Sequence, residues 1–198
     1  MADRERDLER LLTFVDAVVA IAITLLVLPL AEVGSQVNGR SVAELLAMHQ
    51  TDIFGFLLSF VVIARLWVAQ HYIVRSLVRQ SPLLIWLLLA WSLTIVFLPF
   101  PTTLVAGTAH DSLATLLYLG TMALSSLLLA LMAYVIGRDR GLRDSEDKPD
   151  PRQATGTAIG FLLALVVSVA IPAAGYWPLL LLLLVDPIVR RLPRTPGR

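Results

Sequence analysis

The stretch RLLTFVDAVVAIAITLLVLPL, residues 10–30, decides how the rest of the chain is understood. Between Arg10 and Leu30, Asp16 is its only charged residue. A helix of about 20 apolar residues is long enough to cross about 30 Å of hydrocarbon. An aspartate inside such a helix is costly in lipid, so it should face protein and find a hydrogen-bond donor. The stretch therefore predicts a membrane-spanning helix that carries a sheltered carboxylate.

The composition of the whole chain agrees with a membrane protein. Its 198 residues are 57% hydrophobic and 16% charged, whereas soluble domains are near half apolar and near a quarter charged. The net charge is only +1 and no basic cluster is interleaved with aromatic residues, which argues against nucleic acid as a partner. There is no cysteine, and the three histidines are far apart. We therefore expect lipid as a partner, and no cofactor or bound metal.

Charged segments divide the chain into apolar blocks, each close to the length of a membrane span. They predict an all-α integral membrane protein with a single six-helix domain over residues 1–198. The spans are expected at about 11–30, 53–74, 83–105, 113–136, 155–172 and 176–192. The connection between the first two spans contains SVAELLAMH, which favours one or two turns of helix at the membrane interface.

Lysine and arginine set the topology of such a protein, because they are enriched on the cytoplasmic side. Fourteen of the 16 basic residues fall in the two terminal segments, the connection between spans two and three, and the connection between spans four and five. The opposite side receives Arg40 alone. Arg65 lies within the second span, where it must pair with another group or reach water. An even number of spans with both termini in the cytoplasm explains this bias.

The first span has one continuous stripe when it is drawn at about 100° per residue. The stripe consists of Arg10, Phe14, Ala17, Ile21, Thr24, Leu25 and Leu28. Taken alone, such a stripe is typical of ordinary helix packing. Asp16 lies about 120° away from it, on a different face of the helix.

The second span offers two polar residues near the depth of Asp16. His71 lies closest to that depth and is the best candidate partner of the carboxylate, with Arg10 of the first span as an alternative. Trp67 lies one turn deeper on the same face as His71. Together these residues favour a packing lock, or else a proton relay, because a histidine beside a carboxylate can titrate near neutral pH.

These residues also carry a resemblance to a known family. In the first span the matching residues are Arg10, Phe14, Asp16, Ala20, Ile21, Thr24, Leu25 and Leu26; Trp67 and His71 match in the second span, and Trp86 and Leu98–Thr102 (LPFPT) in the third. This pattern resembles the lysosomal potassium channel family, transmembrane protein 175, in its bacterial single-repeat form, over nearly the whole chain. Two positions depart from it: Val15 replaces the usual Ser, and Leu88 the usual Asn.

The resemblance implies a homotetramer in a bacterial-type cell (plasma) membrane, with the first helices lining a central pore. It implies a constriction of aliphatic rings from Ile21, Leu25 and Leu28, with Thr24 as the polar neighbour, in place of a carbonyl filter. Monovalent cations would permeate, with potassium near Ile21 and Thr24. A structural or gating polar cluster would contain Arg10, Phe14, Asp16, Trp67 and His71.

Three functions follow, in order of preference. The first is a passive potassium-selective channel. The second is a proton-coupled or small-solute transporter that uses Asp16 and His71, although the sequence shows no inverted repeat and no matching pair of broken helices. The third, a membrane enzyme, is disfavoured because the spans contain too few polar groups for catalysis. We therefore expect a channel and no enzyme.

Overall fold

A computed structural model of the chain describes residues 2–35, 39, 41–79, 81–107, 111–139 and 141–142. The regular elements in these ranges are α-helices, which confirms the predicted all-α class. The fifth and sixth predicted spans, at about 155–172 and 176–192, lie outside the described residues.

The helices are α1 (Ala2–Leu25), α2 (Leu28–Ser35), α3 (Val42–Met48), α4 (Gln50–Val74), α5 (Pro82–Phe97), α6 (Pro99–Gly107) and α7 (Ser112–Arg138). Four stretches are long and apolar enough to cross a membrane: Arg6–Gly34, Gln50–Val74, Pro82–Gly107 and Ser112–Arg138. Each of them contains one of the first four predicted spans. The first stretch combines α1 with α2, and the third combines α5 with α6.

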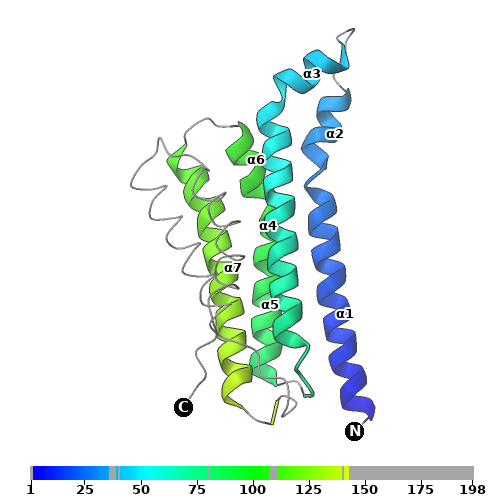
Figure 1. Cartoon of the computed structure of the whole chain (residues 1–198), viewed down its shortest axis with the longest axis vertical. Coiled ribbons are helices and arrows are strands. Elements are labelled where there is room, and N and C mark those ends of the chain that lie inside the picture. Colours follow the sequence, from blue (N-terminus) through cyan, green and yellow to red (C-terminus); the bar gives the residue numbers. More distant parts are fainter. Residues whose placement is uncertain are drawn as a thin grey trace, which may run out of the picture.

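Prolines explain why two of these stretches are divided into two helices. Pro29 has no N–H to donate to the carbonyl of Leu25, so α1 cannot continue regularly. The last turn tightens instead, and the N–H groups of Leu26 and Val27 donate to carbonyls three residues earlier, at 3.3 and 3.2 Å. Pro99 divides α5 from α6 in the same way. Both breaks lie at the same end of the bundle (Figure 1).

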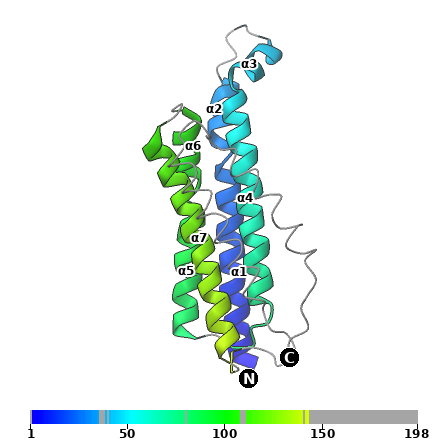
Figure 2. The ribbon, with the colours of Figure 1, turned by 60° about the vertical axis from the view of Figure 1, so that its left-hand side comes forward.

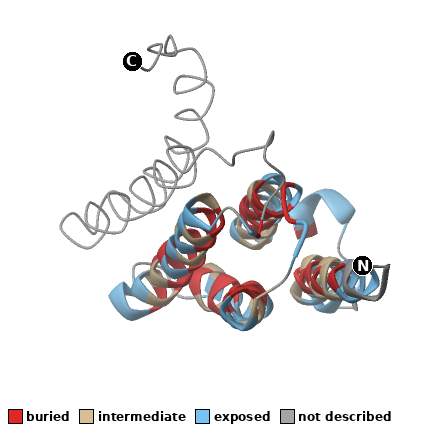
Figure 3. Ribbon diagram, turned by 90° about the horizontal axis from the view of Figure 1, so that it is seen from below, coloured by how far each residue is buried: buried red, intermediate tan, exposed pale blue. Residues whose placement is uncertain are grey.

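The long helices run alternately up and down and form an elongated bundle (Figure 1). α5 packs mainly against α7 and α1, and α4 packs against α6 and α7. The short helix α3 lies at the end of the bundle opposite to the N-terminus (Figures 1 and 2). Viewed along the bundle, the buried residues of the helices face one another (Figure 3). The bundle therefore has a single apolar core between its helices.

Arginines gather at one end of the bundle, where the acidic residues Asp7, Glu9 and Asp139 also lie. Among the described side chains, the arginines at the N-terminal end are Arg6, Arg10, Arg75, Arg79 and Arg138. The acidic residues at the opposite end are Glu32, Glu44, Asp52 and Asp111. Arg65 lies half-buried within α4. The concentration of arginines at one end is what a membrane protein with a positive cytoplasmic side is expected to have.

A chain of buried hydroxyl groups joins α4, α6 and α7. The Ser59 hydroxyl lies 2.9 Å from that of Thr102 and 2.8 Å from that of Tyr118. Thr102 donates its hydrogen to the carbonyl of Leu98 at 2.8 Å, so it can only accept from Ser59. Ser59 then accepts from Tyr118, which fixes one direction along the whole chain. Each hydrogen of the three hydroxyls has an acceptor, which makes the cluster a structural tie.

Removal of the central hydroxyl should destabilise the protein. Ser59→Ala removes the hydrogen bonds that the Ser59 hydroxyl forms with Tyr118 and Thr102. We expect the free energy of unfolding to fall by about 1 kcal/mol, since hydrogen bonds inside membrane proteins average about 0.6 kcal/mol each. Thermal unfolding in detergent measures the effect. Thr103→Ala is the matched control, because the exposed Thr103 hydroxyl bonds only within its own helix. Equal melting temperatures of the two variants would contradict the structural role.

Candidate functional site on the exposed face of α1

One face of α1 is buried against the rest of the bundle. Its buried residues are Leu8, Val15, Val19 and Ala22, and the buried Leu26 directly follows the helix. They recur every three, four or seven positions, as the packed face of a helix should. α5 and α4 are the neighbours that contact α1 most. This face holds α1 in the subunit, so the residues on its other side are free for a different role.

The other face is the stripe predicted from the sequence, and all of it is exposed. Its residues are Arg10, Phe14, Ala17, Ile21, Thr24, Leu25 and Leu28. Phe14, Ile21 and Leu28 are 53%, 59% and 53% exposed, and Leu25 is 38% exposed. The described part of the subunit therefore does not pack on this stripe. Packing against the described helices of the subunit therefore does not explain why Phe14, Ile21, Leu25 and Leu28 are apolar.

The hydroxyl of Thr24 is oriented by its own helix. It donates its hydrogen to the carbonyl of Ile21 at 2.8 Å. Its oxygen lone pairs then remain available on the exposed face. Thr24 therefore presents an acceptor beside Ile21 and Leu25, which is the polarity that a cation or its hydration water requires.

The partner of Asp16 differs from the one that the sequence favours. The indole N–H of Trp67 donates to Asp16 at 2.8 Å. His71 is exposed and packs against Trp67 instead, with the ring centroids 5.7 Å apart. Neither His71 nor Arg10 forms the contact that was expected of it. The error is one helical turn, because His71 and Trp67 lie on the same face and the long indole reaches the carboxylate from deeper in the span.

Asp16, Trp67 and His71 are thus brought together, with Trp67 in the middle. Asp16 and Trp67 are half-buried, and the bond between them joins α1 to α4. A carboxylate with an indole donor is fixed in position, because indole cannot accept a proton from it. The arrangement suits a lock between two helices better than a relay of protons. Phe14 and Arg10 lie on the exposed stripe and not in this cluster.

The hydroxyl chain of Ser59, Thr102 and Tyr118 could not be predicted from the sequence. Its members come from three helices, and a single sequence does not contain the register between them. No group of three or more potential metal ligands occurs among the described residues. The prediction of no metal site applies to the whole chain, and this search covers only the described residues.

Comparisons with known proteins find similarity to TMEM175 channels. Residues 10–99 match the model of the endosomal/lysosomal potassium channel TMEM175 family. The zebrafish (Danio rerio) endosomal/lysosomal proton channel TMEM175 is 28% identical over 123 residues, which are 62% of this chain and 24% of the relative. Over these residues the chain is similar to the TMEM175 family. It spans about a quarter of the length of this curated relative.

A solved structure shares the fold of this chain. It is the crystal structure of a lysosomal potassium-selective channel TMEM175 homolog from Chamaesiphon minutus. The TM-score is 0.78 at 23% identity, and the match covers 94% of this chain and 99% of that one. At this identity the likeness shows the fold alone. The matching family model is that of a potassium channel, which agrees with the expectation of a channel and not of an enzyme with a cofactor.

The two departures from the TMEM175 pattern both lie in the core. Val15 and Leu88 are fully buried, on α1 and α5 respectively. These helices contact each other, so apolar packing occupies positions where the family usually has hydrogen-bonding groups. Trp91, one turn beyond Leu88, is also fully buried, and its indole nitrogen has no hydrogen-bond partner within the described part of the chain.

Proposed function

We propose that the chain is one subunit of a potassium-selective cation channel in which α1 lines the pore. The observation that carries this proposal is the exposed stripe of α1. It lies on the helix with the family signature, it is apolar, and the described helices of its own subunit do not cover it. If the α1 helices of several subunits face a common axis, their stripes would form the wall of the pore.

The constriction would consist of rings of Ile21, Leu25 and Leu28, one residue from each subunit. A narrow apolar ring disfavours hydrated ions and can close a pore by dewetting. Ions that pass it must lose part of their water, which costs less for potassium than for sodium. The acceptor oxygen of Thr24 lies in the same stripe and would replace some of the lost water. Permeant potassium is therefore expected near Ile21 and Thr24.

The complete channel would be a homotetramer of subunits with six spans each. The fifth and sixth spans, within a single domain over residues 1–198, remain part of this proposal. The arginine-rich end of the bundle would lie in the cytoplasm with both termini, in a bacterial-type cell membrane. The described acidic residues at the other end, Glu32, Glu44, Asp52 and Asp111, would attract cations to the outer mouth of the pore.

The proton is the alternative permeant ion to potassium, because the zebrafish relative is named a proton channel. The hydrogen bond from Trp67 to Asp16 favours a structural role for the carboxylate. A proton-coupled transporter that uses Asp16 and His71 is correspondingly less well supported, because these two side chains do not contact each other in the way that was expected.

The test is a selectivity measurement on the full chain reconstituted in liposomes. With potassium on one side and sodium on the other, we expect the reversal potential to move toward the potassium equilibrium potential. A reversal near zero would contradict potassium selectivity. A second recording with equal potassium and a pH gradient detects protons. Absence of any current, together with proton flux driven by an added solute, would support the transporter.

A further inference from the structure

The short helix α3 lies where the bundle leaves the membrane. It occupies the end opposite to the N-terminus (Figure 1). It ends at Met48, and α4 starts at Gln50. The polar residues Gln50, Thr51 and Asp52 separate it from the apolar run that begins at Ile53. Three residues of helix span about 5 Å, so α3 lies within about one turn of the hydrocarbon boundary.

The side chains of α3 divide into two sectors. At about 100° per residue, Leu45 lies between Met48 on one flank and Val42 with Leu46 on the other. Leu45 is buried, and α3 contacts α4. Val42, Leu46 and Met48 are 70%, 54% and 60% exposed. The apolar sector is therefore centred on the buried Leu45, and the side chains on both sides of Leu45 are largely exposed.

The opposite sector of α3 is small or charged. It consists of Ala43, Glu44 and Ala47, all exposed. Ser41 and Glu44 form a capping box at the start of the helix, with the Ser41 N–H donating to the Glu44 carboxylate at 3.0 Å. The Ser41 backbone N–H, and then its side chain, hold the pKa of Glu44 below its usual value. Glu44 therefore stays ionised and marks the face that points to water.

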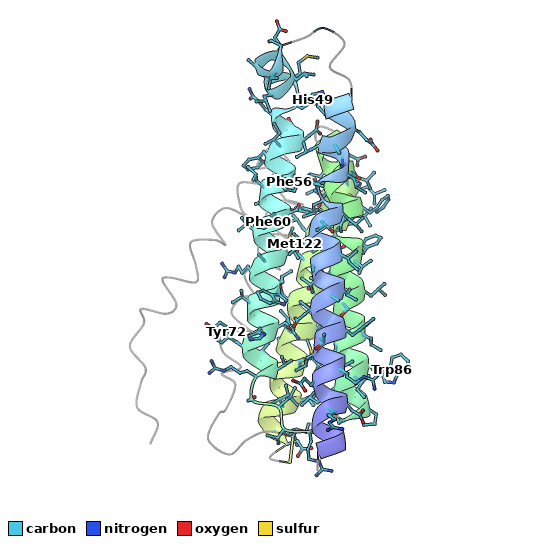
Figure 4. All side chains as sticks on the ribbon, turned by 90° about the vertical axis from the view of Figure 1, so that its right-hand side faces the viewer. His49, Phe56, Phe60, Tyr72, Trp86 and Met122 are labelled. Carbon is cyan, nitrogen blue, oxygen red and sulfur yellow. The ribbon has the colours of Figure 1, made fainter. Side chains whose placement is uncertain are left out.

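The junction with α4 fixes how α3 is turned. His49 stands between the two helices (Figure 4), and its backbone N–H donates to the Leu45 carbonyl at 3.1 Å. Its Nδ1 lies 2.8 Å from a carboxylate oxygen of Asp52 in the first turn of α4. Caps at both ends and this side-chain contact hold a helix of seven residues that would be unstable alone. The orientation of the apolar sector is thus built into the fold.

We propose that α3 lies in the outer interface of the bilayer, with Val42, Leu46 and Met48 inserted at the boundary between headgroups and acyl chains and Ala43, Glu44 and Ala47 facing water. The partner of this surface is lipid. Interfacial helices bury their apolar face about 5–10 Å into this boundary, which matches the place of α3 beside the start of α4. The proposal does not depend on ion conduction, and it holds or fails separately from the channel function.

Single-cysteine spin labelling tests the proposal, because the chain has no cysteine of its own. We would make Val42→Cys, Leu46→Cys and Met48→Cys in the full chain, with Ala43→Cys and Ala47→Cys as matched controls on the opposite sector. Each variant is labelled with a nitroxide and reconstituted in phosphatidylcholine vesicles. Collisions with oxygen report lipid, and collisions with a water-soluble nickel chelate report water.

At positions 42, 46 and 48 we expect oxygen accessibility several-fold higher relative to the nickel chelate than at positions 43 and 47. Equal access of the nickel chelate to all five positions would place α3 in water and overturn the proposal. Low access to both reagents at 42 and 46, with dipolar broadening between labels, would show that a second copy covers the surface and would overturn it as well. All five positions are exposed, so the labels should not prevent folding.

Discussion

Ile21→Asn is expected to remove most of the discrimination between potassium and sodium while the channel still conducts. Ile21 is the most exposed of the large hydrophobic residues in the stripe, at 59%. An amide in its place would hydrate the ring, so an ion would pass without losing as much water. We expect the ratio of potassium to sodium permeability to fall by about tenfold, which equals about 1.4 kcal/mol of lost discrimination. Reversal potentials under mixed potassium and sodium gradients measure this ratio.

Leu93→Asn is the matched control for this variant. Leu93 lies on α5 and is 68% exposed, so the same amide enters an equally exposed position on a different helix. Its permeability ratio should remain that of the unchanged chain. If Leu25→Asn and Ile21→Asn both left the ratio unchanged, the assignment of the α1 stripe to the pore would be wrong. If the control also lost selectivity, the cause would be a general disturbance of the subunit.

The stripe could be predicted because helical periodicity alone determines it. Residues that recur every three or four positions must share a face. The structure places Phe14 and Ile21 on the exposed side of α1, and Leu28 is exposed at the start of α2. The divisions within the first and third spans were also predictable, because Pro29 and Pro99 cannot donate the backbone bond that a continuous helix needs.

Contacts between helices could not be predicted to the same accuracy. The sequence places Trp67 and His71 on one face, one turn apart, but the choice between them depends on how far α4 is shifted along α1. A shift of one turn is about 5.4 Å, which is smaller than the uncertainty of a depth estimated from span ends. The hydroxyl chain around Ser59 requires the register of three helices at once. Both features depend on tertiary packing and not on local sequence.

Trp67→Phe should destabilise the protein more than any other single change of a polar contact described above. The substitution keeps an aromatic ring and removes the N–H that donates to Asp16 at 2.8 Å. The half-buried carboxylate within the span is then left without this donor, and an unsatisfied buried acceptor costs about 1–3 kcal/mol. We expect the free energy of unfolding to fall by about 2 kcal/mol, measured as a lower melting temperature in detergent and in lipid.

Trp86→Phe provides the control, because Trp86 on α5 is 71% exposed and projects away from the bundle (Figure 4). The same substitution there should leave the melting temperature nearly unchanged. Asp16→Asn separates the lock from a gate: the amide oxygen can still accept from Trp67, so stability should be largely kept. If the currents of Asp16→Asn also keep the pH dependence of the unchanged chain, the carboxylate is a lock. If Asp16→Asn keeps its stability but its currents depend differently on pH, the Asp16 carboxylate acts as a gate. If Trp67→Phe has an unchanged melting temperature, the hydrogen bond between Trp67 and Asp16 does not stabilise the protein and the proposed lock is wrong.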